Sequence, residues 1–346
     1  MYEIRFCQYD ELILLQDFLT KHWSHHQRLM HTRQIHVLAS SSKLLRWQHV
    51  NTEDKIINFV VAYNKSSKEF DAILGFIPSS QYDLNIKNRD IWLAIWKVKE
   101  EFASTGIGLQ VFLFLSSNYK ASSIGISGAS EDAMKIYKAF SYKTGILKHF
   151  YIKNDSLTDY KIASFNKVSN VICGANPNID IKKITDKEFL SANISYQYNP
   201  CKTKDYYINR YFNHPFYDYT FNAIVIKNTI IGVFITRKII VDKSACMRIV
   251  DWIGDYSKNL YNEFQKLLQK NDAEYIDLLC KVPNEDEIIE MGFLEKNADN
   301  EVIPNYFEPF LKKNVNIEFA YKTKENNYAI FKADSDQDRP NKIKNC

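Results

Sequence analysis

Two glycines near the middle of the first half of the chain, Gly106 and Gly108, could help to bind an anion. They stand in the stretch STGIGLQVFLFL (104–115), in which an almost unbroken apolar run follows them. A phosphate group needs backbone N–H groups aimed at it, a close approach without a Cβ, and the positive end of a helix dipole. A strand that ends near Val98, the glycine turn and a helix that begins near Ile107 would supply all three. The alternative is an ordinary glycine turn ahead of a buried helix.

A carboxylate and a hydroxyl could act together a few residues earlier. Asp90 opens the apolar strand RDIWLAIWKV (89–98), which leads to the glycine turn. Ser80 ends the preceding strand, with Ser79 as its neighbour, so the connection between the two strands could bring a hydroxyl beside the carboxylate. Their structural alternatives are a turn-capping aspartate and a plain turn serine.

Four histidines near the N-terminus have spacings that a metal ion could use. His22, His25 and His26 would share a helix face, and His31 follows them. No cysteine or acidic residue joins them in a known ligand pattern, so we expect no metal site.

Composition and charge narrow the class of protein. A length of 346 residues predicts two domains. A net charge of +4 is small against 45 basic and 41 acidic residues, which permits small anionic ligands but does not favour a nucleic-acid partner. No apolar run is long enough to span a membrane, and the start MYEIRFCQYDE lacks the pattern of a signal peptide. Six cysteines without a C-x-x-C pair then predict reduced thiols in a cytoplasmic protein. We expect the protein to be a monomer or a homo-oligomer.

Hydrophobic periodicity predicts an α/β order of elements in the first half of the chain. Ser130 is the expected N-cap of its last helix, with acidic residues in the first turn. The expected elements are a strand (2–8), helices (10–23 and 40–50), three strands (57–63, 70–77 and 89–98), a helix from Ile107, a strand (122–129), a helix (130–140) and a closing strand (145–152).

The second half repeats nearly the same order of elements, which indicates a duplicated domain. A polar, aperiodic segment at about 153–178 separates the halves, so we expect domains at 1–154 and 175–346 and a linker at 155–174. The expected elements are a strand (180–185), helices (187–194 and 202–214), strands (221–228, 229–238 and 245–254), a helix (256–270), a strand (274–282), a helix (284–293) and strands within 314–334 that finish the second sheet.

This order resembles the GNAT superfamily of acyl-CoA-dependent N-acyltransferases. In that superfamily a turn of pattern Q/R-x-x-G-x-G/A, between the fourth strand and the next helix, binds the CoA pyrophosphate. The matching positions here are Ala103, Gly106 and Gly108, and the first departs from the pattern because alanine replaces glutamine or arginine. The resemblance implies an α/β (α+β) fold of two tandem GNAT-like domains, each a mixed central sheet flanked by helices. It also implies acyl-CoA as the co-substrate, with no metal.

The same resemblance implies a set of cofactor-binding residues. The backbone of Trp96, Lys97 and Val98 would pair with the pantetheine amides like an added strand. The segment SEDAMKIYKAF (130–140) is similar to the second helix on the CoA side, with the pattern N/S-x-x-A-x-x-x-Y. It assigns Ser130 to the cofactor and Tyr137 to a place beside the thioester sulfur, whereas the alternative for Tyr137 is a half-buried helix tyrosine. The expected pyrophosphate contacts are Ala103, Ser104, Thr105, Gly106, Ile107 and Gly108.

A narrower resemblance concerns the acceptor. The runs 36–49, 73–83, 89–98 and 333–341 are similar to two-domain GNAT N-acyltransferases of bacterial surface-polysaccharide pathways, such as those of anthrose biosynthesis. These enzymes acylate the amino group of a nucleotide-linked 4-amino-4,6-dideoxyhexose. The resemblance implies Asp90 and Ser80 as catalytic residues at the amino-sugar site, since a carboxylate can hold the amine and help to deprotonate it. The expected substrate contacts are His36, Trp47, Ser79, Asp336, Asp338 and Arg339.

The turn of the second half reads WIGDYSKNLY (252–261), with an aspartate where the pyrophosphate would lie. An anion would be repelled there, so we expect that copy to be degenerate and to contribute to the acceptor site. Two other functions stay open: a Fem-type transferase that uses aminoacyl-tRNA, and a non-catalytic tandem GNAT module. The Gly106–Gly108 turn favours CoA over tRNA, and an empty turn would favour the module.

Overall fold

The structure is a computed structural model that describes residues 2–26, 33–165, 178–296, 301–305 and 312–339. Contacts within the chain divide it into two units. The first contains the residues up to Ile126 together with Tyr321–Lys324, and the second contains Ser127–Ala320 and Glu325–Arg339. The predicted linker lies partly outside the described residues.

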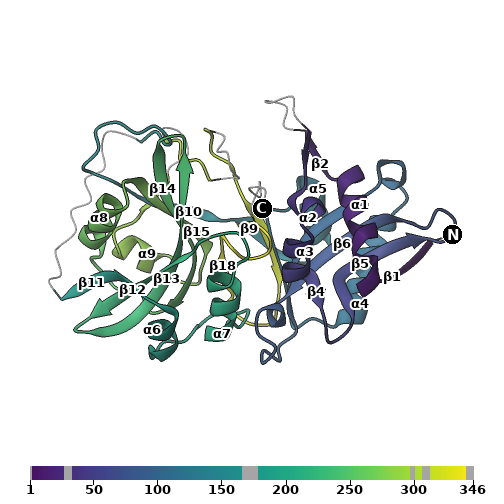
Figure 1. Cartoon of the computed structure of the whole chain (residues 1–346), viewed down its shortest axis with the longest axis horizontal. Coiled ribbons are helices and arrows are strands. Elements are labelled where there is room, and N and C mark those ends of the chain that lie inside the picture. Colours follow the sequence, from purple (N-terminus) through teal and green to yellow (C-terminus); the bar gives the residue numbers. More distant parts are fainter. Residues whose placement is uncertain (1, 27–32, 166–177, 297–300, 306–311, 340–346) are drawn as a thin grey trace. The chain divides into compact units, whose positions relative to one another are not determined.

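The N-terminal part of the chain alternates between strands and helices in the predicted order (Figure 1). Its strands are β1 (Tyr2–Gln8), β2 (Ser24–His26), β3 (Arg33–Ile35), β4 (Val50–Asn51), β5 (Ile56–Asn64), β6 (Glu69–Pro78), β7 (Asp90–Val98) and β8 (Ser123–Ser127). Its helices are α1 (Leu12–His22), α2 (Val37–Ser40), α3 (Ser42–His49) and α4 (Ile107–Tyr119), with short 3-10 turns η1 (Tyr9–Glu11), η2 (Ser79–Gln81) and η3 (Glu100–Phe102).

The remaining elements follow from Glu131 onward. The strands are β9 (Lys143–Ile146), β10 (Lys148–Lys153), β11 (Ile179–Lys183), β12 (Thr220–Ile226), β13 (Thr229–Val241), β14 (Ser244–Gly254), β15 (Ala273–Lys281), β16 (Leu294–Glu295), β17 (Glu318–Lys322) and β18 (Ile330–Phe331). The helices are α5 (Glu131–Ala139), α6 (Asp186–Ser191), α7 (Lys204–Tyr207), a π-helical turn η4 (Ile208–Phe212), α8 (Tyr261–Lys270) and α9 (Asp286–Glu290).

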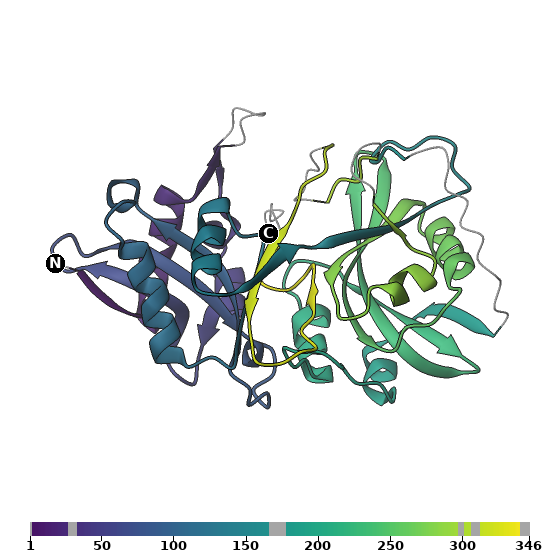
Figure 2. The same ribbon diagram turned by 180° about the vertical axis from the view of Figure 1, so that it is seen from behind.

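Two large mixed sheets organise these elements. The first has the strand order β1-β5-β6-β7-β8-β17-β9, with β4 paired to β5, and the second has the order β11-β12-β13-β14-β15-β10-β16, with β18 paired to β15. In each sheet the neighbours are mostly antiparallel, but β7 and β8 are parallel, and so are β14 and β15. In the first unit α1 and α3 cover one face of the sheet, and α4 covers the other, which is in front when the molecule is seen from behind (Figure 2).

Local sequence explains where the helices around the first sheet begin. The Ser41 side chain accepts the N–H of Leu44 and caps α3, and Ser130 caps α5 by accepting the N–H of Ala133, as predicted for an N-cap serine. Before α4 no side chain caps the helix; Gly106 turns the chain with a positive φ of 77° instead. The apolar residues of α4 then pack against β1, β5, β6 and β7.

Two predicted strand assignments were wrong. The expected single strand at 145–152 is interrupted at Leu147, whose N–H donates to the Ile317 carbonyl, and β10 joins the second sheet beside β15 instead of closing the first. The expected strand within 314–324 is β17, which lies in the first sheet between β8 and β9. Alternation along a strand predicts which residues are buried, but it does not say which sheet the strand joins.

The predicted fold class is confirmed: the chain forms two mixed eight-stranded sheets, each flanked by helices. Within the described ranges, no helix combines the length and the apolar character that crossing a membrane requires. Cys7, Cys201, Cys246 and Cys280 are free thiols; Cys173 and Cys346 lie outside the described residues.

Candidate functional site

The glycine turn between β7 and α4 leaves several backbone N–H groups open. The N–H groups of Ser104, Gly106, Gly108 and Leu109 have no hydrogen-bond acceptor among the residues that the structure describes. Because α4 begins at Ile107, these donors lie at the positive end of the helix dipole. Residues 103–106 are exposed, so an anion can approach the turn from solvent. The arrangement has the donors and the field that a phosphate group needs.

The structure requires glycine at Gly106 and at Gly108 for different reasons. A Cβ on Gly106 would meet no atom within 4 Å, so this glycine provides the positive φ and leaves open space beside the turn. A Cβ on Gly108 would lie 2.9 Å from Cγ2 of Val98, so this glycine lets α4 pack closely against β7. The exposed Ala103 supplies no cation, which leaves the backbone as the donor set of the turn.

Lys99 fixes the start of the turn to the neighbouring strand β6. Its backbone N–H donates to the carbonyl of Asp71 at 2.9 Å, and its Nζ lies 2.9 Å from Glu69 and 3.2 Å from Asp71. Burial disfavours the charged form of Lys99, but the bonds to the two carboxylates prevail and raise its pKa. Lys99 is therefore a structural cation, already paired within the protein.

The first sheet opens beside β7. Parallel pairing of β7 with β8 runs from Asp90↔Ser123 to Leu93↔Ile126 and ends there, while β7 continues to Val98 along β6. A register shift in the β6–β7 ladder, between Leu74↔Trp96 and Phe76↔Leu93, marks a bulge at the same level. Residues 94–98, which include Trp96, Lys97 and Val98, thus have an edge that β8 does not pair. We call this edge the β7 slot.

Asp90 lies at the closed end of the slot and is buried. Its Oδ1 accepts the hydroxyl of Ser123 at 2.6 Å, a partner that sequence analysis missed. A signal was available, because Asp90 and Ser123 each open a strand on either side of the crossover helix, and the parallel register pairs them. On the other side of β7 the ladder with β6 ends at Pro78↔Ile91, and Ser79 and Asp90 are the residues next to this last pair.

Ser79 fits the role of a ligand-binding hydroxyl better than Ser80. Its Oγ is buried and has no hydrogen-bond partner among the described residues, whereas Ser80 is half-buried. Buried hydroxyls are usually satisfied, so an orphaned one needs an explanation such as a ligand. We refer to Ser79, Asp90 and Ser123 as the strand-end cluster.

Two predicted substrate contacts of the first unit have structural tasks. His36 is buried and caps α2, because its Nδ1 accepts the N–H of Leu38 at 3.3 Å. Trp47 is half-buried against the ring of Tyr82, at 5.1 Å between centroids, and its carbonyl accepts a hydrogen bond from the Gln81 side chain. These contacts position both side chains, and their role in binding a substrate stays a prediction.

Tyr137 and Ser130 lie on α5 and belong to the second unit. Tyr137 is fully buried, with its ring 5.3 Å from that of Tyr142. Burial raises the pKa of Tyr137 far above its ordinary value, so its hydroxyl keeps its proton at any physiological pH.

The second unit repeats the open strand but fills the opening with its own chain. Parallel pairing of β14 with β15 ends at Ile249↔Leu278, while β14 continues to Gly254. There β18 pairs with β15, and the N–H of Ala333 donates to the carbonyl of Val250 at 3.0 Å. The segment 330–338, which we call the plug, therefore lies in the opening that corresponds to the β7 slot.

Buried ion pairs hold the plug in place. Nζ of Lys202 lies 2.8 Å from Asp251 on β14 and 2.9 Å from Asp334 in the plug, and all three side chains are inaccessible to solvent. Arg237 binds the carboxylate of Asp338 at 2.7 Å, which holds the pKa of Asp338 well below its usual range despite burial. The other two predicted substrate contacts, Asp336 and Arg339, form an ion pair with each other. The backbone carbonyl of Arg339 accepts a hydrogen bond from the Tyr217 hydroxyl, and the Asp338 carboxylate accepts one from the Tyr219 hydroxyl.

The turn that follows β14 is also unlike the glycine turn. The N–H groups of Asn259 and Leu260, just before α8, donate to the carbonyls of Glu290 and Met291, so these two donors are used within the protein. Asp255 is exposed at this turn, as the sequence indicated. The second turn is therefore not built to bind an anion.

A metal site is not visible in the described part of the chain, where no three His, Cys, Asp or Glu side chains form a group that could hold an ion. Of the four N-terminal histidines, His22 ends α1 and contacts Phe18. The side chains of His25 and His26, and all of His31, lie outside the described residues.

No model of a known protein family matches the sequence, and no curated protein matches it. Solved structures match the fold at low sequence identity. A GCN5-related N-acetyltransferase from Anabaena variabilis ATCC 29413 is 11% identical, with a TM-score of 0.53 over 92% of this chain and 72% of its own. A conserved protein of unknown function from Enterococcus faecalis V583, described as a probable N-acyltransferase, is 9% identical, with a TM-score of 0.51 over 93% of this chain and 73% of its own. The likeness establishes the fold that this chain shares with both.

Proposed function

We propose that the protein is an acyl-CoA-dependent N-acyltransferase with one cofactor site, in the first unit. The observation that carries this proposal is the turn before α4, where four N–H groups without an acceptor among the described residues stand at a helix N-terminus, next to a strand edge that β8 does not pair. CoA joins a pyrophosphate to a pantetheine arm with two amides. The turn offers partners for the pyrophosphate, and the slot just before it in the chain offers partners for the amides. The tandem GNAT-like fold is the setting in which such a pair of features is expected.

The cofactor would be held almost entirely by backbone groups. The pyrophosphate would accept hydrogen bonds from the N–H groups of Ser104, Gly106 and Gly108, and the pantetheine amides would pair with the β7 slot as an added strand. When bound, acyl-CoA supplies the thioester whose carbonyl carbon is attacked by the acceptor amine. The plug occupies the matching opening of the second unit, so we assign a single acyl-CoA to each chain.

The strand-end cluster is the proposed acceptor site. Asp90 precedes Ala94, where the slot begins, by four residues, or about 13 Å of extended strand. Asp90 would therefore hold the acceptor and accept a proton from its amine, directly or through water, and would not contact the cofactor turn. Ser123 orients the Asp90 carboxylate, and the orphaned hydroxyl of Ser79 would bind the acceptor.

The place of Tyr137 beside the thioester sulfur stays a prediction from the resemblance, because Tyr137 belongs to the second unit. Burial raises the pKa of its hydroxyl, which keeps the hydroxyl protonated and makes it a weak acid, so it would donate a hydrogen bond rather than its proton. The proposed acceptor is a nucleotide-linked amino-dideoxy sugar of the type dTDP-4-amino-4,6-dideoxyhexose, used in surface-polysaccharide or O-antigen biosynthesis. The resemblance of the runs around Trp47, Ser79 and Asp90 to enzymes of that class supports this choice.

A direct assay tests the proposal. The full chain is incubated with acetyl-CoA or a hydroxyacyl-CoA and, in turn, dTDP-, UDP- and GDP-linked 4-amino-4,6-dideoxyhexoses, and free thiol is followed over time. We expect thiol release that depends on the amino sugar and an N-acylated product detectable by mass spectrometry. Release with none of the amino sugars, together with tight CoA binding, would refute the sugar acceptor while leaving the cofactor site standing. Absence of CoA binding would refute both.

A further inference from the structure

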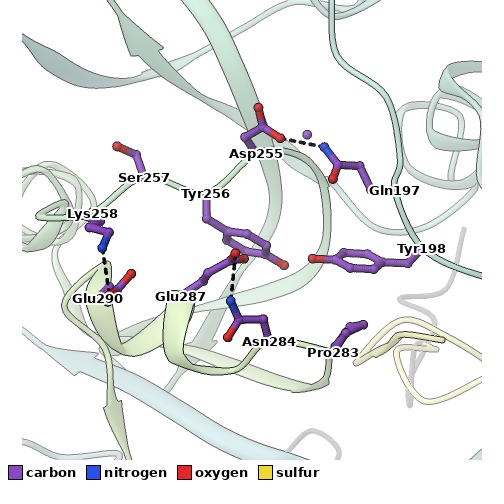
Figure 3. Close-up of a pocket in the computed structure, with 11 residues that line it drawn as sticks. Gln197, Tyr198, Asp255, Tyr256, Ser257, Lys258, Pro283, Asn284, Glu287 and Glu290 are labelled. Atoms are coloured by element: carbon purple, nitrogen blue, oxygen red, sulfur yellow. Dashed lines mark hydrogen bonds and ion pairs between the residues drawn. The ribbon is translucent and has the colours of Figure 1, made fainter. Parts of the chain in front are cut away.

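The second unit has a pocket at the turn that replaces the cofactor turn. The pocket is lined by Gln197 and Tyr198, by the segment 254–258 between β14 and α8, and by residues of α9 and the chain just before it. Its volume is about 530 Å³. Small-molecule sites in proteins span a few hundred to about a thousand Å³, so the pocket can hold a ligand the size of a monosaccharide. We call it the α9 pocket (Figure 3).

The charge of the α9 pocket is negative and incompletely balanced. Three carboxylates line it, those of Asp255, Glu287 and Glu290, against one cation, Lys258. Nζ of Lys258 lies 2.9 Å from Glu290, so this pair is neutral. Within the described residues, Asp255 and Glu287 have no cation at ion-pair distance. Each accepts one neutral amide, from Gln197 at 2.7 Å and from Asn284 at 3.1 Å respectively.

The aromatic wall of the pocket is rigid and offers hydroxyls. The ring of Tyr256 stacks on Trp252 at 4.6 Å, and Trp252 stacks in turn on Phe234 at 5.3 Å. The hydroxyl of Tyr256 points toward that of Tyr198 across the pocket (Figure 3). Burial, together with the neighbouring Tyr198 hydroxyl, raises the pKa of Tyr256, so its hydroxyl keeps its proton and can donate a hydrogen bond. A ring face, hydroxyls and unbalanced carboxylates together are the groups that bind an organic ammonium ion.

We propose that the α9 pocket binds a small polar molecule that carries a primary ammonium group. The two unbalanced carboxylates would accept its N–H groups, and the tyrosine rings and hydroxyls would contact its carbon skeleton and hydroxyls. An anion is excluded by the same carboxylates and by the occupied N–H groups before α8. The turn after β14 corresponds to the glycine turn of the first unit, but its pocket would bind a cation where the glycine turn would bind an anion. The proposal does not depend on acyl transfer, because every residue in it belongs to the second unit.

Calorimetric titration of the full chain with D-glucosamine tests the site, with N-acetyl-D-glucosamine as the uncharged analogue and inorganic pyrophosphate as the anion. We expect saturable binding of glucosamine and at least about tenfold weaker binding of the acetylated sugar, since one charged hydrogen-bonding group is lost. Asp255→Asn and Glu287→Gln should each weaken glucosamine binding about tenfold.

Asp242→Asn is the matched control, because Asp242 is exposed in the β13–β14 hairpin with a positive φ that asparagine tolerates. Its affinity for glucosamine should equal that of the unaltered protein. The proposal is overturned if both sugars bind equally, if the pocket variants bind glucosamine as the control does, or if no glucosamine binds. Circular dichroism spectra that match the unaltered protein establish that the pocket variants are folded.

Discussion

At the residue scale, the strand-end cluster concentrates polar groups in an apolar sheet. Asp90 and Ser123 are buried and bonded to each other at 2.6 Å, and Ser79 is buried without a partner. Burying polar groups costs free energy unless they are bonded, so a cluster with an unsatisfied hydroxyl is more readily explained by a ligand than by folding.

Asp90→Asn is the sharpest test of this cluster. The amide has the shape of the carboxylate and can still accept the Ser123 hydroxyl, but it cannot take a proton from an amine. We expect kcat on the amino-sugar acceptor to fall about a hundredfold or more, with CoA affinity unchanged. Steady-state kinetics together with CoA titration measure both. Unchanged kcat would remove Asp90 from the mechanism, and loss of CoA binding would show that the variant has altered the fold.

A buried histidine makes the stability of the second unit dependent on pH. His214 is buried, and its Nδ1 accepts the N–H groups of Phe216 and Tyr217 at 3.2 and 2.9 Å. Burial, helped by the charge of Arg210, lowers the pKa of His214 to about 3. Between that value and the ordinary pKa near 6.5, the unfolded chain binds a proton that the folded chain does not. The free energy of unfolding should therefore fall as pH is lowered from about 6.5 toward 3.

His214→Asn isolates this contribution, because the asparagine carbonyl can accept the same N–H groups and does not titrate. Urea unfolding at pH 7, 6, 5 and 4 should give a pH slope that is smaller in the variant, by up to about 1.4 kcal/mol per pH unit. Parallel curves for the two proteins would mean that His214 is protonated in the folded state as readily as in the unfolded one.

At the scale of elements, the proposed cofactor site consists of a turn, a helix end and a strand edge. The turn and the start of α4 could be predicted from the sequence, because the glycines and the apolar run that follows them lie next to each other in the chain. It also anticipated that the sheet must open beside Trp96–Val98, but only from the resemblance. The exact end of pairing at Leu93↔Ile126 depends on the bulge between β6 and β7, which no local pattern announces.

Ser104→Asp tests the turn better than a change at Gly108. A side chain at Gly108 would collide with Val98, so such a variant would confuse packing with anion binding. Ser104 is exposed and its N–H is open, so an added carboxylate should repel the pyrophosphate without disturbing the fold. We expect CoA to bind about tenfold or more weakly by calorimetry.

Ser117→Asp provides the matched control for this change. Ser117 is exposed near the C-terminal end of α4, ten residues after Ile107, or about 15 Å along the helix axis from its start. It should bind CoA as the unaltered protein does. Equal weakening in both variants would contradict a site at the helix N-terminus and would point to a general effect of added negative charge.

At the scale of the whole molecule, duplication has given two copies of one fold with different openings beside the fourth strand. The order of elements made the duplication readable from sequence. The plug was not readable, because Ile330–Asp338 looks like a short strand followed by a charged tail, and only long-range ion pairs with Lys202 and Arg237 reveal that it is buried. Of the aspartates predicted to face a ligand, Asp338 is buried and bonded to Arg237, whereas Asp336 pairs with Arg339.

Hydrophobic periodicity predicts that a segment is a strand but does not predict which sheet the strand joins. β10 and β17 were predicted as strands, and both are strands, yet each joins the sheet that its position in the chain does not suggest. Sheet membership is decided by pairing partners far away in sequence, which a single chain's local pattern does not contain.

We infer that one of the two copies binds acyl-CoA and that the other is closed by its own chain. Calorimetric titration of the full-length protein with CoA measures this directly. We predict a stoichiometry of one CoA per chain, with binding weakened by Ser104→Asp and unaffected by Ser117→Asp. A stoichiometry of two, or a single site insensitive to Ser104→Asp, would contradict the account.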